Sequence, residues 1–338
     1  MADAKHGQHW LIYALGGGLG HLHRAITLAR AARKAAHSCC ILTNSPYAHL
    51  LPLTEQLAKT DQVIRIDPTL DRDGVKERIA TVIEETDFDV FVVDTFPRGL
   101  GGELFELLPG ISVPKVLIHR DLNPQYVEQL QLSDFIANYD KIILPGENAA
   151  YANAPQSEKT APWLIADADE ILSPNEARHK LRAAQNTLPI IAVIGSGKTD
   201  ELVETTRIAA ILDERFGHEA CIRYIRPRDL APNIDGAHRT LALWPLLPTY
   251  SAVSLVVGAG GYNTVQECRA TATPLIAMPR KRMYDRQLRR LQDAEIARDI
   301  DDMTGKVEAV IESGLELREG LADYQNGVHH GVQTIQQL

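Results

Sequence analysis

Residues 10–21 have the sequence WLIYALGGGLGH, in which an apolar run from Trp10 to Leu15 leads into a glycine-rich loop. A short apolar run bounded by glycines is typical of a buried β-strand. From about His21 to Ala36 the apolar residues recur at helical spacing. A strand, a tight loop and a helix in succession indicate the start of a βαβ unit.

The same alternation of apolar runs and amphipathic stretches continues through both halves of the chain. It is typical of parallel sheets covered by helices on both faces, so we predict an α/β fold. The further strands predicted in the first half are Ser38 to Thr43, Val63 to Ile66, Val90 to Val93, Val116 to His119 and Lys141 to Leu144. Those in the second half are Pro189 to Ile194, Cys221 to Ile225, Thr240 to Leu243, Leu255 to Val257 and Leu275 to Met278, with helices from Asp200 to Phe216 and from Asn263.

A chain of 338 residues fits two domains of ordinary size. Between Pro145 and Leu188 the strand and helix pattern weakens into Ala, Pro, Ser, Asn and charged residues, which is typical of a linker region. We therefore predict an N-terminal domain over 1–165, a linker over 166–187 and a C-terminal domain over 188–320. The last segment, 321–338, is predicted as a helix that packs back across the linker.

Composition excludes several classes of protein. The net charge of −9 argues against a nucleic-acid-binding protein, whose surface is normally basic. No stretch approaches the roughly 20 apolar residues of a membrane span. The apolar run at Trp10 is also too short for a signal peptide, so we expect a soluble, cytoplasmic protein. The four cysteines show no zinc-binding spacing and are expected to be buried free thiols: Cys39, Cys40, Cys221 and Cys268.

The first loop with chemical potential is Gly16 to His21. A dinucleotide-binding GxGxxG motif fails here, because histidine stands where the last glycine is needed. Glycines permit close approach of a ligand to the backbone, and the helix N-terminus attracts negative or polar groups. His21 is our first candidate for a general base, since a histidine near neutral pH can accept a proton from a hydroxyl. The loop glycines predicted to contact such a ligand are Gly17, Gly18 and Gly20.

Three polar residues lie at or just beyond the ends of predicted strands in the first half. Asp94, His119 and Asp121 follow the apolar runs that begin at Val90 and Val116. Ligands of open α/β sheets bind at the carboxyl ends of the strands. We therefore predict that these three residues bind the molecule whose hydroxyl is deprotonated, or serve as alternative bases ranked below His21.

The second loop is Gly195-Ser196-Gly197-Lys198-Thr199, again directly after an apolar strand. A P-loop of the form GxxxxGK[ST] would need glycine at position 192, where the chain has Ala192, so an NTPase is rejected. Backbone amides, Ser196 and Lys198 still suit a phosphate. We predict that Gly195, Ser196, Gly197 and Lys198 contact a phosphate group of a ligand; a turn between domains without a ligand is the alternative.

The third loop, Gly258 to Glu267, follows another buried strand. Asn263 or Thr264 is predicted to cap the next helix, whose free amides could bind a diphosphate, and Glu267 lies about one turn further on, where it could bind the hydroxyls of a ribose. Beyond the next strand, Asp285 and Gln287 suit sugar hydroxyls. The full set predicted to bind a diphosphate ligand that carries a ribose and a sugar is Gly260, Gly261, Asn263, Thr264, Glu267, Asp285 and Gln287.

Two charged stretches have competing interpretations. Asp71-Arg72-Asp73 has the spacing of a metal-binding DxD motif but is expected to be a surface turn, so we predict no metal site. A cluster of basic residues near the third loop indicates either phosphate attraction or a solvated basic face. The cluster comprises Arg280, Lys281, Arg282, Arg286, Arg289 and Arg290.

These motifs resemble those of the GT-B glycosyltransferases related to the bacterial enzyme that adds N-acetylglucosamine to the peptidoglycan lipid precursor. GGGLGH is similar to that family's N-terminal GGxGGH loop, although Leu19 replaces a glycine and the helix lacks the usual proline. GAGGYNTVQE resembles the donor segment, and Asp285 to Gln287 matches a DRQ motif. The segments 90–97, 101–104 and 119–122 resemble a poorly characterised group of predicted glycosyltransferases in the same clan.

The resemblance implies two Rossmann-like domains that face a cleft, with the nucleotide-sugar donor mainly in the C-terminal domain. It implies transfer with inversion and without metal, from a UDP-sugar such as UDP-GlcNAc, to an acceptor that the sequence does not identify. The sugar nucleotide is then a co-substrate, and no cofactor is expected. Attachment to a membrane surface, to reach a lipid acceptor, is an alternative that the net charge does not favour.

Two other functions fit the same residues. A UDP-sugar 2-epimerase or hydrolase on this fold would use buried carboxylates near the sugar instead of His21. A non-catalytic sugar-nucleotide-binding module would keep the fold and have lost the chemistry. Turnover without an acceptor would indicate the first, and binding without turnover the second.

Overall fold

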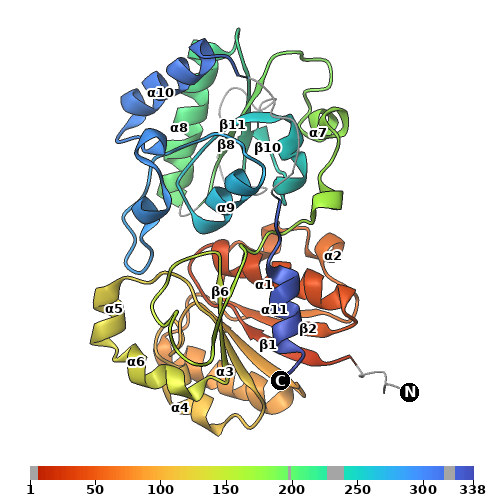
Figure 1. Cartoon of the computed structure of the whole chain (residues 1–338), viewed down its shortest axis with the longest axis vertical. Helices are drawn as coiled ribbons and strands as arrows, with labels where there is room; N and C mark the ends of the chain where they lie inside the picture. Colours follow the sequence, from red (N-terminus) through yellow and green to blue (C-terminus); the bar gives the residue numbers. More distant parts are fainter. Residues whose placement is uncertain (1–6, 197–198, 227–239, 316–323) are drawn as a thin grey trace. The chain divides into compact units, whose positions relative to one another are not determined.

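The computed structural model describes residues 7–196, 199–226, 240–315 and 324–338 (Figure 1). The chain forms two compact units. Unit 1 comprises Met1–Ile165 and Asn326–Leu338, and unit 2 comprises Ala166–Gln325. Each unit contains one sheet, and every pairing between its strands is parallel. The prediction of two α/β halves with parallel sheets is therefore confirmed.

The sheet of unit 1 has seven strands in the order β3-β2-β1-β4-β5-β6-β7. From β1 the chain continues outward to β2 and β3, and β4 then starts the other half of the sheet. The strand order therefore reverses between β1 and β4, the position at which open α/β sheets bind ligands. The strands are β1 (His9–Tyr13), β2 (Ser38–Thr43), β3 (Gln62–Arg65), β4 (Val90–Asp94), β5 (Lys115–Ile118), β6 (Lys141–Pro145) and β7 (Ser157–Thr160).

Helices cover both faces of this sheet because alternate residues of its central strands are apolar on each face. One face packs Leu11, Tyr13 and Phe91 against α3 (Arg72–Glu85), α4 (Leu104–Leu107) and α6 (Leu132–Phe135). α1 (Gly20–Lys34) and α11 (Val328–Ile335) lie side by side and also pack on the strands (Figure 1). The remaining helices of unit 1 are α2 (Leu53–Gln56) and α5 (Pro124–Gln129).

The sheet of unit 2 repeats this plan with five strands in the order β10-β9-β8-β11-β12. Its strand order reverses between β8 and β11, and α8 and α10 pack their apolar residues against one face. The strands are β8 (Ile190–Ile194), β9 (Cys221–Ile225), β10 (Thr240–Leu241), β11 (Val253–Gly258) and β12 (Leu275–Ala277). The helices are α7 (Pro174–Lys180), α8 (Thr199–Phe216), α9 (Tyr262–Ala270) and α10 (Ile300–Glu312).

The structure differs from the sequence prediction between Pro145 and Leu188, where it has regular elements. β7 is an edge strand of sequence SEKT that pairs with β6, and it has no apolar pattern because little of it is buried. α7 begins with a capping box, in which Ser173 and Glu176 satisfy each other's backbone amides. The four cysteines are free and buried, as predicted. None of the helices in the described ranges has the length and apolarity that crossing a bilayer requires.

Gly331 generates a test of the packing of α11 on unit 1. A Cβ atom at this position would lie 2.4 Å from Cζ2 of the buried Trp163 ring. We expect Gly331→Ala to lower the free energy of unfolding by about 1 to 3 kcal/mol, because overpacking forces neighbouring groups to move. Urea denaturation followed by tryptophan fluorescence measures the change.

Gly305→Ala in α10 is the matched control, because a Cβ there meets nothing within 4 Å. A helix-interior glycine replaced by alanine without a clash should gain up to about 1 kcal/mol. Equal effects of the two substitutions would contradict the packing described for α11.

Candidate active site

The loop Gly16 to Gly20 leaves the carboxyl end of β1 and leads into α1. The Gly16 N–H donates to Asn44 Oδ1 at 2.7 Å, which ties the loop to the end of β2. A Cβ atom at Gly16 would lie 2.1 Å from Cδ2 of His21, so glycine is required there by the imidazole itself. At Gly17, Gly18 and Gly20 an added Cβ would meet nothing within 4 Å.

None of these four glycines has a backbone φ in the left-handed region. Conformational strain therefore does not explain the glycines at 17, 18 and 20, and neither does packing. α1 begins at Gly20, and its N-cap residue, Leu19, makes no side-chain hydrogen bond to the helix end. The loop thus offers open space and helix amides without a side-chain cap, which suits a polar ligand.

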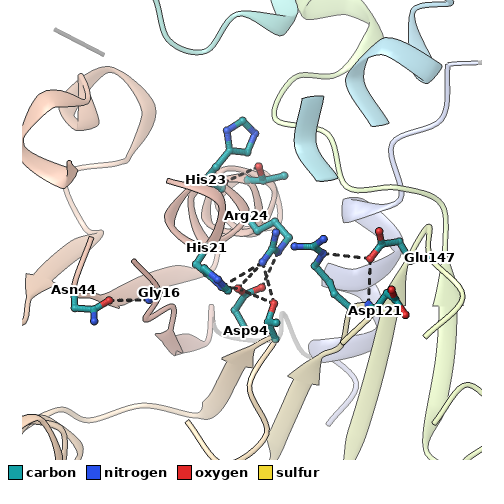
Figure 2. A network of polar contacts seen from close by, with 11 residues as sticks. Gly16, His21, His23, Arg24, Asn44, Asp94, Asp121 and Glu147 are labelled. Carbon is teal, nitrogen blue, oxygen red and sulfur yellow. Dashed lines mark hydrogen bonds and ion pairs between the residues drawn. The ribbon is translucent and has the colours of Figure 1, made fainter. Parts of the chain in front are cut away.

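His21 pairs with Asp94 across the point where the strand order reverses (Figure 2). His21 Nδ1 lies 2.6 Å from Asp94 Oδ2, and the imidazole stacks on Phe96 with ring centroids 5.2 Å apart. The exposed fraction is 18% for the His21 side chain and 3% for that of Asp94. An ionised carboxylate only accepts hydrogen bonds, so Nδ1 carries the proton and Nε2 carries the lone pair.

Arg24 binds the same carboxylate from one turn further along α1. Its Nε donates to Asp94 Oδ1 at 2.8 Å, and its Nη2 donates to Asp94 Oδ2 at 2.7 Å. Nη2 also donates to Thr95 Oγ1 at 3.0 Å, and the Thr95 hydroxyl donates to Asp94 Oδ2 at 3.2 Å. The Asp94 carboxylate thus accepts four hydrogen bonds in this buried site.

The charges around the pair determine its protonation. Burial raises the pKa of Asp94, but the Arg24 charge and the His21 hydrogen bond outweigh burial and hold that pKa well below its usual range. Burial lowers the pKa of His21; Asp94 opposes this effect, and Arg24 and Arg120 add to it. An ionised aspartate beside a neutral imidazole is an arrangement suited to general-base catalysis.

Thr95 is strained, since its φ is 72° and a β-branched residue seldom adopts the left-handed region. Strain of this kind clusters at functional sites, where the surrounding structure enforces it. The loop after Thr95 is anchored by Glu103, a buried residue that accepts hydrogen bonds from the Tyr13 hydroxyl and from Gly101 N–H (2.7 Å). The GGE sequence at 101–103 is therefore an internal support for the end of β4.

The residues after β5 are buried against those after β6. His119 is 0% exposed, neither of its ring nitrogens has a hydrogen-bond partner in the described part of the chain, and its ring centroid lies 4.9 Å from that of Tyr151. Burial lowers the pKa of His119 to about 4, so its ring is neutral. Arg120 pairs with Glu147 at 3.4 Å, and the Asp121 N–H donates to Glu147 at 3.2 Å. Of the predicted alternative bases, Asp94 contacts His21 and His119 is closed to solvent.

In unit 2, the loop after β11 leads into α9 without a side-chain cap. The N-cap is Gly261 and the helix begins at Tyr262, so the prediction that Asn263 or Thr264 caps the helix is wrong. Both residues lie inside the first turn, and Asn263 Oδ1 is buried with no hydrogen-bond partner among the residues that the structure describes. Gly260 has φ 70° and faces Leu291, whose Cδ1 would lie 2.9 Å from an added Cβ. Uncapped amides at this end are available to an anion.

Glu267 lies on the same face of α9 as Asn263 and Thr264, three to four residues further on. It is 6% exposed and accepts a hydrogen bond from the Tyr250 hydroxyl at 3.4 Å. Burial raises the pKa of Tyr250, which keeps that hydroxyl protonated as a donor. A carboxylate has further acceptor positions, so a contact with Tyr250 leaves capacity for a ligand hydroxyl.

The other predicted donor residues of unit 2 have internal contacts. Gln287 is buried, and its Oε1 accepts the Arg280 N–H at 2.8 Å, while Asp285 pairs with Arg290. Gly195, after β8, is required by packing, because a Cβ there would lie 2.5 Å from the Tyr224 hydroxyl. Ser196 is the last described residue of its loop; Gly197 and Lys198 lie outside the described residues.

Part of the basic cluster beyond β12 forms ion pairs within unit 2. Arg282 binds Glu201 of α8 through two hydrogen-bonded contacts, of which the Nη2–Oε2 distance is 2.8 Å, and Arg280 binds Glu204 at 2.6 Å. These two arginines therefore pair with carboxylates of α8, a contact that neither interpretation from the sequence anticipated, and phosphate attraction by the cluster stays a prediction. Lys281 and Arg289 are exposed.

Three residues of the site in unit 1 escaped sequence reasoning: Arg24, Asn44 and Thr95. Arg24 lies three residues after His21 on the predicted helix but away from its apolar positions, so no local pattern indicated that it is buried. The expected surface turn at Asp71-Arg72-Asp73 is instead the exposed start of α3, where Asp71 is the N-cap and accepts the Gly74 N–H at 2.9 Å. Within the described ranges, no three His, Cys, Asp or Glu side chains gather as metal ligands.

Comparison with known proteins supports the fold. No family model matches the chain, and no curated protein matches it in sequence. Similar solved structures include the glycosyltransferase of kitacinnamycin (16% identity, TM-score 0.61, 98% of this chain and 99% of that one). The spinosyn forosaminyltransferase SpnP has 14% identity, TM-score 0.58 and coverage of 98% and 96%. The glycosyltransferase VinC in complex with DTDP has 11% identity, TM-score 0.52 and coverage of 97% and 95%.

These likenesses extend over both units and show that the chain has the GT-B fold of these glycosyltransferases. The specific resemblance to the peptidoglycan enzyme, which rests on short motifs, stays a prediction.

The Asp94 network generates a test of stability. Asp94→Asn leaves the Arg24 guanidinium buried without its counter-charge, so we expect the free energy of unfolding to fall by about 3 to 5 kcal/mol at pH 7. The folded-state pKa of Asp94 is lowered, so its stabilising contribution is fully present above the unfolded-state pKa of about 3.9 and is lost progressively as the pH falls from there toward the lower folded-state pKa. Urea denaturation between pH 2 and 7 measures the loss of stability at pH 7 and its decline in acid.

Glu308→Gln is the control, since Glu308 pairs with Arg215 at 2.9 Å but its side chain is 42% exposed. We expect the free energy of unfolding of this control variant to fall by at most about 1 kcal/mol. A similar small loss for Asp94→Asn, or a difference from wild type that does not shrink in acid, would refute the ion pair as described.

Proposed function

We propose that the chain is a glycosyltransferase that transfers a sugar from a nucleotide-diphosphate sugar to an acceptor hydroxyl. A UDP-sugar such as UDP-GlcNAc is the first candidate for the donor. The observation that carries the proposal is the His21–Asp94 pair at the end of β1, in a chain with the GT-B fold. Nδ1 is committed to Asp94, and Nε2 has no hydrogen-bond partner among the described residues, which leaves it for a substrate proton.

In this mechanism the acceptor hydroxyl donates to His21 Nε2. As the acceptor oxygen attacks the anomeric carbon, its proton passes to Nε2 and the bond to the diphosphate breaks. One direct displacement by one activated oxygen inverts the configuration at that carbon. Asp94 stabilises the imidazolium that forms and holds the ring in the required tautomer.

The acceptor is proposed to lie over the loop of Gly17, Gly18 and Gly20. Open space at all three positions supports this proposal, because neither φ nor protein packing requires glycine there. Phe96, which stacks on His21, holds the ring from beneath. Asp121 remains a proposed contributor to the acceptor side. His119 is proposed to act there only indirectly, as the buried neighbour of the Arg120–Glu147 pair, because its ring is closed to solvent.

The donor is proposed to bind unit 2 at the uncapped start of α9. Amides of Gly261, Asn263 and Thr264 would stabilise the negative charge that gathers on the departing diphosphate, so the transfer needs no metal ion. Glu267 would accept hydrogen bonds from the ribose, and Asp285 and Gln287 would bind the donor sugar. Gly195, Ser196, Gly197, Lys198 and Gly260 complete the proposed donor residues. That VinC, a protein with this fold, was solved with DTDP supports a nucleotide diphosphate as part of the donor.

A thermal-shift screen with UDP, GDP, dTDP and their sugars tests the donor first, because a ligand that binds only the folded state raises the unfolding temperature. Assays with candidate acceptors then distinguish the functions. Transfer that depends on an acceptor supports the proposal. Sugar-nucleotide turnover without an acceptor indicates an epimerase or hydrolase, and binding without turnover across a broad acceptor panel indicates a binding module.

His21→Ala should lower kcat by about 100-fold or more, because loss of a general base removes that much rate, while donor affinity stays nearly unchanged. Steady-state kinetics and donor titration measure the two effects separately. His49→Ala, at an exposed histidine of the same unit, is the control and should retain wild-type kcat. Equal kcat in the two variants would remove His21 from the mechanism.

Glu267→Gln should weaken binding of the nucleotide diphosphate by about 1 to 3 kcal/mol, since hydrogen bonds to a charged group are lost. Calorimetric titration with the nucleotide selected by the screen measures the affinity. Glu308→Gln, which removes an exposed partner of Arg215 in the same unit, should leave it unchanged. Unaltered affinity in the Glu267 variant would place the ribose elsewhere.

A further inference from the structure

Arg24 is buried to a degree that is unusual for arginine. It is 2% exposed, and it lies on α1 three residues after His21, which places both side chains on one face of the helix. Residues 22, 25 and 26, which surround it in the sequence, are buried apolar residues. An arginine in such a place costs stability unless its charge is compensated, and Asp94 compensates it with two hydrogen bonds.

The hydrogens of the Arg24 guanidinium determine which groups donate hydrogen bonds to which among Arg24, His21 and Asp94. Nη2 lies 3.4 Å from His21 Nδ1, close enough to compete for the imidazole. Nη2 has two hydrogens, and it donates to Asp94 Oδ2 at 2.7 Å and to Thr95 Oγ1 at 3.0 Å. Neither is left for His21, so Nδ1 keeps its own proton and donates it to Asp94.

The charges of Asp94 and Arg24 together affect whether the His21 imidazole is protonated. An aspartate alone beside a histidine favours the imidazolium and would raise the fraction of His21 that is protonated near neutral pH. Burial of the imidazole already disfavours its charged form, and the Asp94 charge is matched by Arg24, so a proton on His21 would give the group a net positive charge. Among the described residues, Arg120, after β5, also acts on His21 and adds to the lowering of its pKa; Arg120 pairs with Glu147, after β6, at 3.4 Å.

We infer that Arg24 is a positioning residue that neutralises Asp94 and so keeps the His21 imidazole unprotonated, with the lone pair of Nε2 available at and below neutral pH. Asp94 then acts on His21 mainly through the direction of its hydrogen bond. This inference rests on the proposed function only where it assigns a use to that lone pair. The electrostatic part concerns the folded protein without any substrate.

The test is an NMR titration of the His21 ring in the wild-type protein and in Arg24→Gln and Arg24→Lys. We expect the wild-type midpoint below the ordinary histidine value of about 6.5. Arg24→Gln should raise it by about one pH unit or more, because the aspartate then acts without a counter-charge. Arg24→Lys keeps the charge and should remain close to wild type. The acid limb of the pH–rate profile should move with the midpoint in each variant.

A wild-type midpoint above about 7 would overturn the inference without any variant, even if Arg24→Gln fails to fold. So would a folded Arg24→Gln protein whose midpoint equals that of the wild type. If the NMR midpoint moves as expected while the pH–rate profile does not, the role of Arg24 stands and His21 is no longer the base. The two proposals can therefore fail separately.

Discussion

The Asp94 carboxylate lies at the end of β4 with almost no exposure to solvent, where an unpaired charge would cost several kcal/mol. It stays ionised because Arg24 binds both of its oxygens and because His21 and Thr95 donate to it as well. The rest of the site follows from this charge. An ionised acceptor fixes the tautomer of His21, and the strained Thr95 gives the carboxylate one of its donors.

The two parallel sheets place a glycine loop and the start of a helix in equivalent positions. In each unit the strand order reverses once, between β1 and β4 in unit 1 and between β8 and β11 in unit 2, and a glycine loop leads into a helix beside that point. In both loops one glycine is required by close contact, Gly16 by His21 and Gly260 by Leu291. Both helices start without a side-chain cap. The fold thus provides one uncapped helix end in each unit, one proposed for the acceptor and one for the diphosphate.

Much of the fold could be predicted from the sequence, because buried parallel strands are continuous apolar runs that end in glycine or polar residues. β7 could not, since an edge strand of sequence SEKT carries no such signal. The start of α9 was placed too late, because glycine at the N-cap leaves no side-chain signal and the polar residues follow inside the first turn. His21 and Asp94 were both found as candidates, but as rivals. Only the adjacency of β1 and β4 shows that they work as a pair across 73 positions.

The central claim is that an ionised Asp94 holds the proton on Nδ1 of His21 and leaves Nε2 bare. Nitrogen-15 NMR of the ring at pH 7 measures this directly, because protonated and unprotonated imidazole nitrogens have well-separated shifts. The account predicts a protonated Nδ1 and an unprotonated Nε2. A ring protonated on Nε2 alone, or on both nitrogens, would contradict it.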